Sequence, residues 1–307
     1  MATPELEIDF IDQHFAALMN RLAKVPSPEL ELAAKLVSNF RARGDVCVPL
    51  RNVTATEAGK LGSTEVPALK NWVKKLRSSG VVGDPGEFAP LILDQSDRLY
   101  LQRYWKYEDE LGRNLQARLG DKSPRDFDAG DLVQGIAELF PGPSDLQKVA
   151  AFVAATSRLC VISGAPGTGK TRTIVLICAL LIRLAAKREL TFALAAPTGK
   201  AAARLKETIA QTGMSLRLPG HLKLPADAST IQRLLGARGD SPHFRHKAKN
   251  PLTADVVIVD EASMIDLALL AKLFDAIRPD ARIILVGDKD QLASVEARVC
   301  REPRQSS

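Results

Sequence analysis

The sequence predicts an α/β fold with a parallel sheet, preceded by a mainly helical N-terminal domain. Apolar runs that end near residues 163, 196 and 259 each predict a buried strand, and the first two lead directly into helical segments. Strands that alternate with helices are typical of a parallel sheet. By contrast, residues 6–43 carry apolar side chains at helical spacing.

Composition bounds the class of protein. The chain has 307 residues, 46% hydrophobic and 25% charged, which predicts a soluble protein with room for two domains. Its longest apolar run, 174–182, ends at Arg183 and is far shorter than the roughly 20 residues that a membrane span needs. The acidic N-terminus has no signal-peptide pattern. We therefore expect a cytoplasmic protein with no membrane contact.

The N-terminal region contains several helical patterns. The apolar residues within 11–22 and within 32–40 recur three or four positions apart, with a proline break between the two runs. Residues 44–50 predict a turn and a short extended segment. Thr54–Glu57 has the spacing of a capping box, and the apolar residues within 69–76 predict another amphipathic helix.

Aromatic residues gather near the end of this region, at Tyr100, Tyr104, Trp105 and Tyr107. Such side chains can stack on nucleic-acid bases or fill a helix or hairpin core, and we expect the core. Residues 112–130 are rich in Gly, Asp, Arg and Lys and contain a proline, so we expect the linker there. The first domain is then residues 1–120.

The segment from Val161 to Thr171 reads V-I-S-G-A-P-G-T-G-K-T. A G-x-x-x-x-G-K-T pattern between a strand and a helix is a phosphate-binding loop, because its backbone N–H groups converge on phosphate oxygens. The lysine reaches the β- and γ-phosphates and the threonine hydroxyl ligates Mg²⁺. The predicted nucleotide-binding residues are Gly164, Ala165, Pro166, Gly167, Thr168, Gly169, Lys170 and Thr171.

Gln147, upstream of this loop, admits two interpretations. Ser144-Asp-Leu-Gln147 has the spacing of a capping box, in which Gln147 bonds back to the N–H of Ser144. Alternatively, a glutamine at this distance before a phosphate loop can contact the adenine edge of the nucleotide. The two roles do not exclude one another.

A second strand-to-helix turn carries Thr198 and Lys200. The apolar run 191–196 leads through P-T-G-K into a helical segment. This is either an ordinary connection or a loop that contacts nucleic-acid phosphate beside a helix N-terminus. Residues 187–249 hold 12 Lys+Arg and 4 Asp+Glu, a net charge of +8, which favours contact with a phosphate backbone.

The third apolar run ends in two carboxylates. The sequence D-V-V-I-V-D-E-A-S puts Asp260 and Glu261 at the carboxyl end of a buried strand. One carboxylate can hold Mg²⁺ and the other can orient an attacking water. Thr171 and Asp260 are therefore the predicted metal ligands.

A further buried strand is predicted at 282–286, and it runs into G-D-K-D-Q-L. Asp288 and Gln291 would then lie on a loop near the γ-phosphate. The alternative is a polar turn that caps a helix at Asp290.

Taken in order, the segments G-A-P-G-T-G-K-T, A-A-P-T-G-K-A-A, V-V-I-V-D-E-A-S-M and L-V-G-D-K-D-Q-L resemble motifs I, Ia, II and III of superfamily 1 DNA helicases. More narrowly, they resemble the RecD family, the alpha subunit of the bacterial exonuclease V, RecBCD. The resemblance covers about residues 1–297. It implies a P-loop NTPase domain, the RecA-like motor domain 1A, at 121–297.

The resemblance also implies an activity. Members of this family are ATP-dependent motors that move 5′ to 3′ on single-stranded DNA, in a complex with RecB-like and RecC-like subunits that acts in recombinational double-strand break repair. ATP and Mg²⁺ would be the cofactors. The roles carried over are catalysis for Lys170, Asp260, Glu261 and Gln291, adenine contact for Gln147, and DNA contact for Thr198 and Lys200.

Residues 298–307, R-V-C-R-E-P-R-Q-S-S, depart from the family pattern and predict neither strand nor helix. The family's motifs IV to VI do not occur in the sequence, and they include the arginine that completes the ATP site from a second motor domain. We therefore expect a truncated or frameshifted member of the family. Such a chain would neither unwind DNA nor hydrolyse ATP at a motor's rate.

Two other function classes remain open. The chain could bind ATP without hydrolysing it and dock on partner subunits as an interaction module. It could also be another P-loop NTPase such as a GTPase, but no N-K-x-D guanine-reading motif follows the phosphate loop. ATP hydrolysis measured with and without single-stranded DNA separates the helicase from the interaction module.

Overall fold

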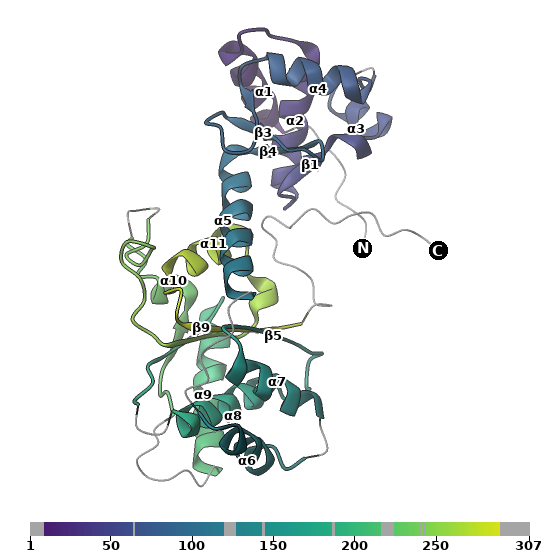
Figure 1. The fold of residues 1–307 in the computed structure, drawn as a ribbon. Coiled ribbons are helices and arrows are strands. Elements are labelled where there is room, and N and C mark those ends of the chain that lie inside the picture. The colour runs from purple at the N-terminus through teal and green to yellow at the C-terminus, as the bar shows by residue number, and fades with distance from the viewer. Residues whose placement is uncertain are drawn as a thin grey trace. The chain divides into compact units, whose positions relative to one another are not determined.

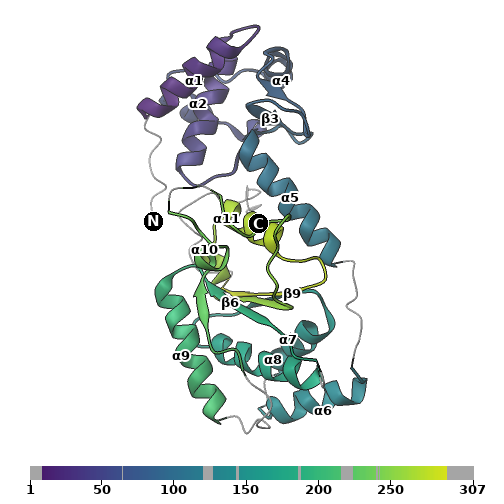
Figure 2. The ribbon, with the colours of Figure 1, turned by 90° about the vertical axis from the view of Figure 1, so that its left-hand side faces the viewer.

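The computed structural model describes residues 9–63, 65–119, 127–142, 145–185, 188–215, 224–239, 241 and 243–288. These residues form two compact units. Unit 1 contains the described residues up to Asp109 together with Asp266–Ala268, and unit 2 contains those from Glu110 to Ile265 and from Leu269 onward. Figures 1 and 2 show the elements of each unit.

Four helices form the larger part of unit 1: α1 (Phe10–Leu22), α2 (Pro28–Ala42), α3 (Ala55–Lys60) and α4 (Leu69–Ser78). Each lies where the apolar spacing or the capping box predicted a helix. The Thr54 side chain accepts from the Glu57 N–H, and the Glu57 carboxylate accepts from the Thr54 N–H, which confirms the capping box. The helices pack around Trp72, which is fully buried and donates its indole N–H to the Glu29 carbonyl at 2.9 Å.

Unit 1 also contains a small sheet, of which the sequence predicted the short extended segment within 44–50 and a strand-like segment at 99–101 but not the strand pairing. Its strands are β1 (Cys47–Pro49), β2 (Val82–Gly83), β3 (Leu91–Leu93) and β4 (Arg98–Leu101), in the order β1-β4-β3-β2. The β1–β4 and β3–β4 pairs are antiparallel and the β2–β3 pair is parallel. Each strand has at most four residues, too few for an alternating pattern to stand out.

Helix α5 (Gln102–Leu119) contains the boundary between the two units. Its last turns occupy residues 112–119, so the first part of the segment that the sequence assigned to a linker is helical. The physical reason is the position of its buried side chains. Tyr104, Leu111 and Arg118 are buried and lie seven residues apart, which puts them on one face of a continuous helix.

Unit 2 contains a five-stranded parallel sheet, as the sequence predicted. Its strands are β5 (Leu159–Ser163), β6 (Phe192–Ala196), β7 (Ala228–Thr230), β8 (Val256–Val259) and β9 (Arg282–Gly287). The order is β5-β9-β8-β6-β7, and every neighbouring pair is parallel. Strand β5 therefore lies at an edge of the described sheet, and Val161 in it is 67% exposed.

Helices cover the two faces of this sheet. Figures 1 and 2 show α6, α7, α8 and α9 on one face and α11 on the other. The bounds of these helices are Ala129–Leu139 (α6), Asp145–Thr156 (α7), Lys170–Leu184 (α8), Gly199–Ser215 (α9) and Leu267–Ala276 (α11). Unit 2 also contains the short helices α10 (Ile231–Leu234) and η2 (Ala262–Met264). Cys160, Ile258 and Ile284 alternate with their neighbours along the strands and join the core beneath α8.

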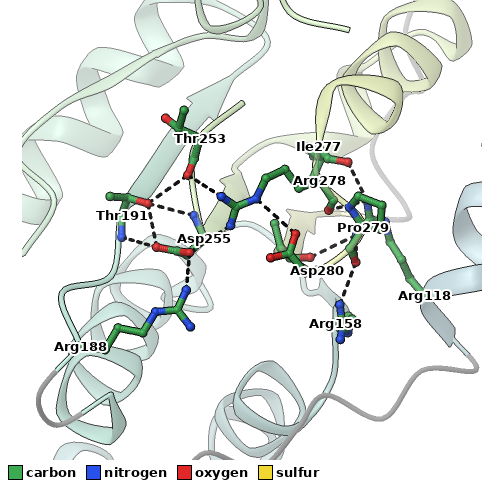
Figure 3. A network of polar contacts seen from close by, with 11 residues as sticks. Arg118, Arg158, Arg188, Thr191, Thr253, Asp255, Ile277, Arg278, Pro279 and Asp280 are labelled. Carbon is green, nitrogen blue, oxygen red and sulfur yellow. Dashed lines mark hydrogen bonds and ion pairs between the residues drawn. The ribbon is translucent and has the colours of Figure 1, made fainter. Parts of the chain in front are cut away.

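The amino ends of the strands, here called the amino edge, are joined by a polar network (Figure 3). Asp255 lies just before β8 and accepts from Arg188 at 2.7 Å, from Arg278 at 3.1 Å and from the hydroxyl of Thr191 at 2.8 Å. Arg118 is 4% exposed and donates to the carbonyls of residues 277, 278, 279 and 281 at 3.1–3.3 Å. These contacts satisfy carbonyls beyond the end of α11 that have no partner in the helix.

None of the helices in the described ranges combines the length and apolar character that a membrane crossing requires.

Candidate nucleotide-binding site

The phosphate loop, residues 164–171, connects the carboxyl end of β5 to the first turn of α8. Gly167 and Gly169 have φ of +80° and +79°, a left-handed conformation that favours glycine. At Gly164 a Cβ would lie 2.9 Å from the Thr168 hydroxyl oxygen. Backbone conformation therefore favours glycine at 167 and 169, and the close approach of the Thr168 side chain favours it at 164.

Lys170 is the first residue of α8, and its ammonium turns back over the loop. Nζ donates to the carbonyl of Gly164 at 2.6 Å and to that of Ala165 at 3.0 Å. Charged phosphate oxygens are stronger acceptors for an ammonium than neutral carbonyls are. The loop thus holds its lysine within reach of any phosphate that the backbone N–H groups would bind.

Thr171 and Asp260 come from different elements and meet at the carboxyl edge, where the strands end. The Thr171 hydroxyl donates to Asp260 Oδ2 at 3.2 Å, and the Glu261 N–H donates to Asp260 Oδ1 at 2.9 Å. Asp260 is 6% exposed. Burial, helped by the neighbouring Glu261 charge, raises the pKa of Asp260, although the Glu261 N–H, the Thr171 hydroxyl and Lys170 oppose the shift.

These two oxygen ligands fit Mg²⁺. The ion prefers oxygen ligands in octahedral geometry and is usually held by one or two carboxylates together with substrate phosphates and water. Within the described residues, no group of three or more His, Cys, Asp or Glu could hold a metal ion. A nucleotide-bound Mg²⁺ needs no such group, because phosphates and water supply its remaining ligands.

Glu261 follows Asp260 and has an unusual backbone. Its φ is +52°, and the only other non-glycine residue with a positive φ in the described ranges is Asp97. A left-handed conformation at a residue with a Cβ costs free energy and is often found at functional sites. Here it turns the chain sharply at the end of β8, immediately before η2.

Ser263 and Gly287 also contact the residues of the site, and sequence analysis assigned neither of them a role. A Cβ on Gly287 would lie 3.0 Å from the backbone nitrogen of Ser263, so a larger residue would push η2 away from β9. The Asp288 N–H lies 3.5 Å from the Ser263 hydroxyl oxygen, and the Gly164 N–H donates to the Gly287 carbonyl at 3.2 Å. Gly287 therefore touches both the phosphate loop and the segment after Asp260.

Gln147, in α7, contacts the phosphate loop. Its Nε2 donates to the Thr168 carbonyl at 3.4 Å and lies 3.6 Å from where a Cβ on Gly169 would be. This contact joins α7 to the phosphate loop. Ser144, the predicted capping partner, and Gln291, the predicted γ-phosphate sensor, lie outside the described residues.

Thr198 and Lys200 lie at the start of α9, after β6. The Thr198 hydroxyl accepts from the Ala201 N–H at 3.2 Å and so caps the helix. Both side chains are exposed. The capping role agrees with an ordinary strand-to-helix connection and leaves the Lys200 ammonium accessible to solvent.

Comparison with known proteins supports the sequence resemblance. Residues 7–100 match the N-terminal domain of RecBCD enzyme subunit RecD, and residues 147–297 match the AAA domain family AAA_19. RecBCD enzyme subunit RecD of Mycolicibacterium smegmatis is 40% identical over 296 residues, which are 93% of this chain and 50% of the relative. The chain belongs to the RecD family.

Other RecD proteins agree. RecD of Haemophilus influenzae is 38% identical over 70% of this chain and 35% of its own length, so the chain spans about half or less of the RecD relatives it matches. Among solved structures, a Pif1 helicase on forked DNA matches 49% of the chain at 20% identity. Its TM-score of 0.31 is too low to support the fold, which rests on the sheet itself and on the RecD match.

Proposed function

We propose that this chain contains the ATP-binding motor domain of a 5′-to-3′ DNA helicase subunit in a RecBCD-type exonuclease V. One observation carries the proposal. Lys170, Thr171, Asp260 and Glu261 lie together where parallel strands β5 and β8 end, in a member of the RecD family. This is the residue set that phosphoryl transfer from ATP to water requires.

Each residue has a distinct part in that chemistry. The N–H groups of the phosphate loop and the Lys170 ammonium bind the β- and γ-phosphates of ATP. Thr171 and Asp260 would hold Mg²⁺, which would supply positive charge to offset that of the phosphates. Glu261 orients the attacking water and accepts its proton. In this proposal Gln147 contacts the adenine, and Gln291 senses the γ-phosphate.

Single-stranded DNA is the proposed polymer substrate. Thr198 and Lys200 would contact its phosphates, supported by the net charge of +8 in residues 187–249, where 12 Lys+Arg exceed 4 Asp+Glu. Binding should be sequence-independent and should weaken steeply between low and physiological salt, because neutralised phosphates release counterions. Anisotropy of labelled oligothymidine measures it, and an affinity that stays flat with salt would contradict the proposal.

The proposed partners are RecB-like and RecC-like subunits in the cytoplasm. In the proposed division, residues 1–120 form the docking domain and residues 121–297 the motor domain. Because the RecD relatives are about twice as long as this chain, the resemblance assigns the arginine that completes the ATP site to the part of those relatives that this chain does not cover.

The test is ATP hydrolysis by two proteins: this chain, and this chain fused to the second half of the Mycolicibacterium smegmatis RecD. We expect both to bind Mg·ATP, and only the fusion to hydrolyse it with DNA stimulation and to unwind a 5′-tailed duplex. Glu261→Gln should abolish ATP hydrolysis by the fusion without affecting Mg·ATP binding. A fusion that binds ATP but shows no DNA-stimulated hydrolysis would overturn the helicase proposal in favour of a non-hydrolysing interaction module.

A further inference from the structure

Helix α1 in unit 1 carries a second apolar stripe besides the one it buries. Helix α1 packs on α2 (Figure 2). Its buried residues are Asp12, Ala16 and Met19. A different set follows the spacing i, i+4, i+7, i+11 and so lines up on a neighbouring face of the helix: Ile11, Phe15, Leu18 and Leu22. We call this set the α1 stripe.

The α1 stripe is not covered within the described residues. Ile11 is 63% exposed, Leu18 is 37% and Leu22 is 55%. Phe15 is partly buried against the core of unit 1. Single exposed apolar residues are common on protein surfaces, but a contiguous row of them marks an interaction site.

A groove continues from the stripe. Ile11 and Phe15 line a cavity of about 350 Å³, together with Leu101 and Tyr104. This volume accommodates one or two large apolar side chains. The stripe and the groove together offer a row of contacts and a pocket for an anchor, the combination by which grooves bind amphipathic helices.

Two arginines, Arg41 and Arg103, also line the groove. Their guanidinium carbons lie 4.9 and 5.7 Å from the centre of the Tyr104 ring, and Arg41 donates to the Tyr104 hydroxyl. Within the described part of the chain, neither arginine forms an ion pair with a carboxylate. An apolar groove with two uncompensated positive charges is complementary to an apolar segment that carries acidic residues.

We propose that the α1 stripe and this groove dock an acidic amphipathic helix of a partner polypeptide. A leucine or phenylalanine of that helix sits in the groove, and its Asp or Glu residues face Arg41 and Arg103. A nucleic acid fits less well, because it would leave the aliphatic stripe uncovered. Tyr104 is only 5% exposed and does not offer its ring for base stacking.

This inference identifies the surface through which the chain would bind its partner subunits, and it rests on the proposed subunit role. The test is binding of the full chain to the RecB-like and RecC-like chains of its own organism, measured by co-elution and biolayer interferometry. The stripe variant is Leu18→Ser with Leu22→Ser, and the charge variant is Arg103→Glu. Phe88→Ser is the matched control, because Phe88 is fully exposed between β2 and β3, and is not part of the stripe or the groove.

We expect the stripe variant and the charge variant each to weaken binding at least about tenfold, as for residues at the centre of an interface. The Phe88→Ser control should bind like the unchanged chain, and unaltered melting curves would show that all variants fold. High salt should weaken the unchanged chain and leave the affinity of Arg103→Glu nearly constant.

Three results would overturn the inference. Undiminished binding by both variants would show that the α1 stripe and the groove are not the docking surface, and would leave the proposed subunit role intact. No binding by the unchanged chain, with Mg·ATP binding intact, would refute the subunit role and this inference together. A homodimer that the stripe variant dissolves, detected by sedimentation, would assign the surface to a second copy of this chain.

Discussion

Two aspartates flank the same strand and have opposite electrostatic environments. Asp255 comes before β8 at the amino edge, and Asp260 follows β8 at the carboxyl edge. Burial alone would raise the pKa of Asp255, but the Thr191 N–H and hydroxyl and the Arg278 and Arg188 guanidinium groups outweigh it and lower that pKa. Burial raises the pKa of Asp260, and its partners do not reverse the shift.

The difference separates stability from function. A carboxylate with a lowered pKa stabilises the fold when ionised, whereas one with a raised pKa destabilises it. Ionising Asp260 therefore costs the unliganded fold free energy, and the proposed Mg²⁺ would offset that cost. Variants at the amino edge should change the melting temperature without changing the response to nucleotide, and variants at the carboxyl edge should chiefly change the response to nucleotide.

The largest expected effect belongs to the amino edge. Arg118→Ala removes the donor to four carbonyls at a buried position, and we expect a loss of about 3–4 kcal/mol in the free energy of unfolding. Arg118→Lys should recover only part of it, because an ammonium cannot reach all four acceptors in the fork geometry of a guanidinium. Urea unfolding measures both, and wild-type stability in Arg118→Ala would contradict the structural role.

The next largest effect is expected at the carboxyl edge. Lys170→Ala should weaken Mg·ATP binding by about 3 kcal/mol, roughly a hundredfold, and abolish the rise in melting temperature that Mg·ATP gives the unchanged chain. Arg172→Ala is the control. Arg172 lies two residues after Lys170, carries the same charge and has an exposed side chain. If the Lys170→Ala protein still melts at a higher temperature with millimolar Mg·ATP, the phosphate loop is not the nucleotide site.

A smaller effect is expected for Asp255→Asn, about 1–2 kcal/mol, because the amide keeps one acceptor oxygen and loses the charge. The sign with pH follows from the lowered pKa of Asp255. The stability that the carboxylate contributes is complete above the ordinary aspartate pKa and is lost as the pH falls through the lowered value. Melting curves from neutral pH into acid should therefore show the variant and the unchanged chain converging, and a constant difference would be the contrary result.

The smallest expected change in stability is for Asp260→Asn, and it has the opposite sign. Because the pKa of Asp260 is raised, its ionisation weakens the fold as the pH rises through that value. The variant should melt slightly higher than the unchanged chain at neutral pH, and the difference should disappear in acid. It should also lose the Mg²⁺-dependent part of nucleotide stabilisation. A lower melting temperature at neutral pH would show that the Thr171 and Glu261 contacts outweigh the burial of the charge.

The sequence predicted the carboxyl edge well because the chemistry there is local. A strand, a glycine-rich turn and a helix N-terminus are adjacent in the chain, so the phosphate loop with Lys170 and Thr171 could be recognised from spacing alone. The end of β8 was equally clear, because an apolar run stops at two carboxylates. In the structure, the phosphate loop joins β5 to α8 and the two carboxylates follow β8, as predicted.

The sequence did not predict contacts between distant segments. Ser263 and Asp288 are 25 residues apart, and nothing in either segment indicates that a glycine at 287 lets them meet. Arg118 looked like part of a polar linker because its partners are backbone carbonyls about 160 residues later. Such contacts depend on the order of strands in the sheet, which local patterns do not encode.

Strand β5 pairs with β9 alone among the described strands. The Gly164 N–H donates to Gly287 and the Arg158 carbonyl accepts from Ile283, so even-numbered residues of β5 direct their amides toward β9. The amides of Leu159 and Val161 point the other way. In deuterated solvent the amide of Ile162 should keep its proton long after that of Val161 has exchanged. Amide exchange rates measured by NMR should therefore alternate between slow and fast along β5. A segment that pairs with the free edge of β5 would slow the exchange of the Leu159 and Val161 amides.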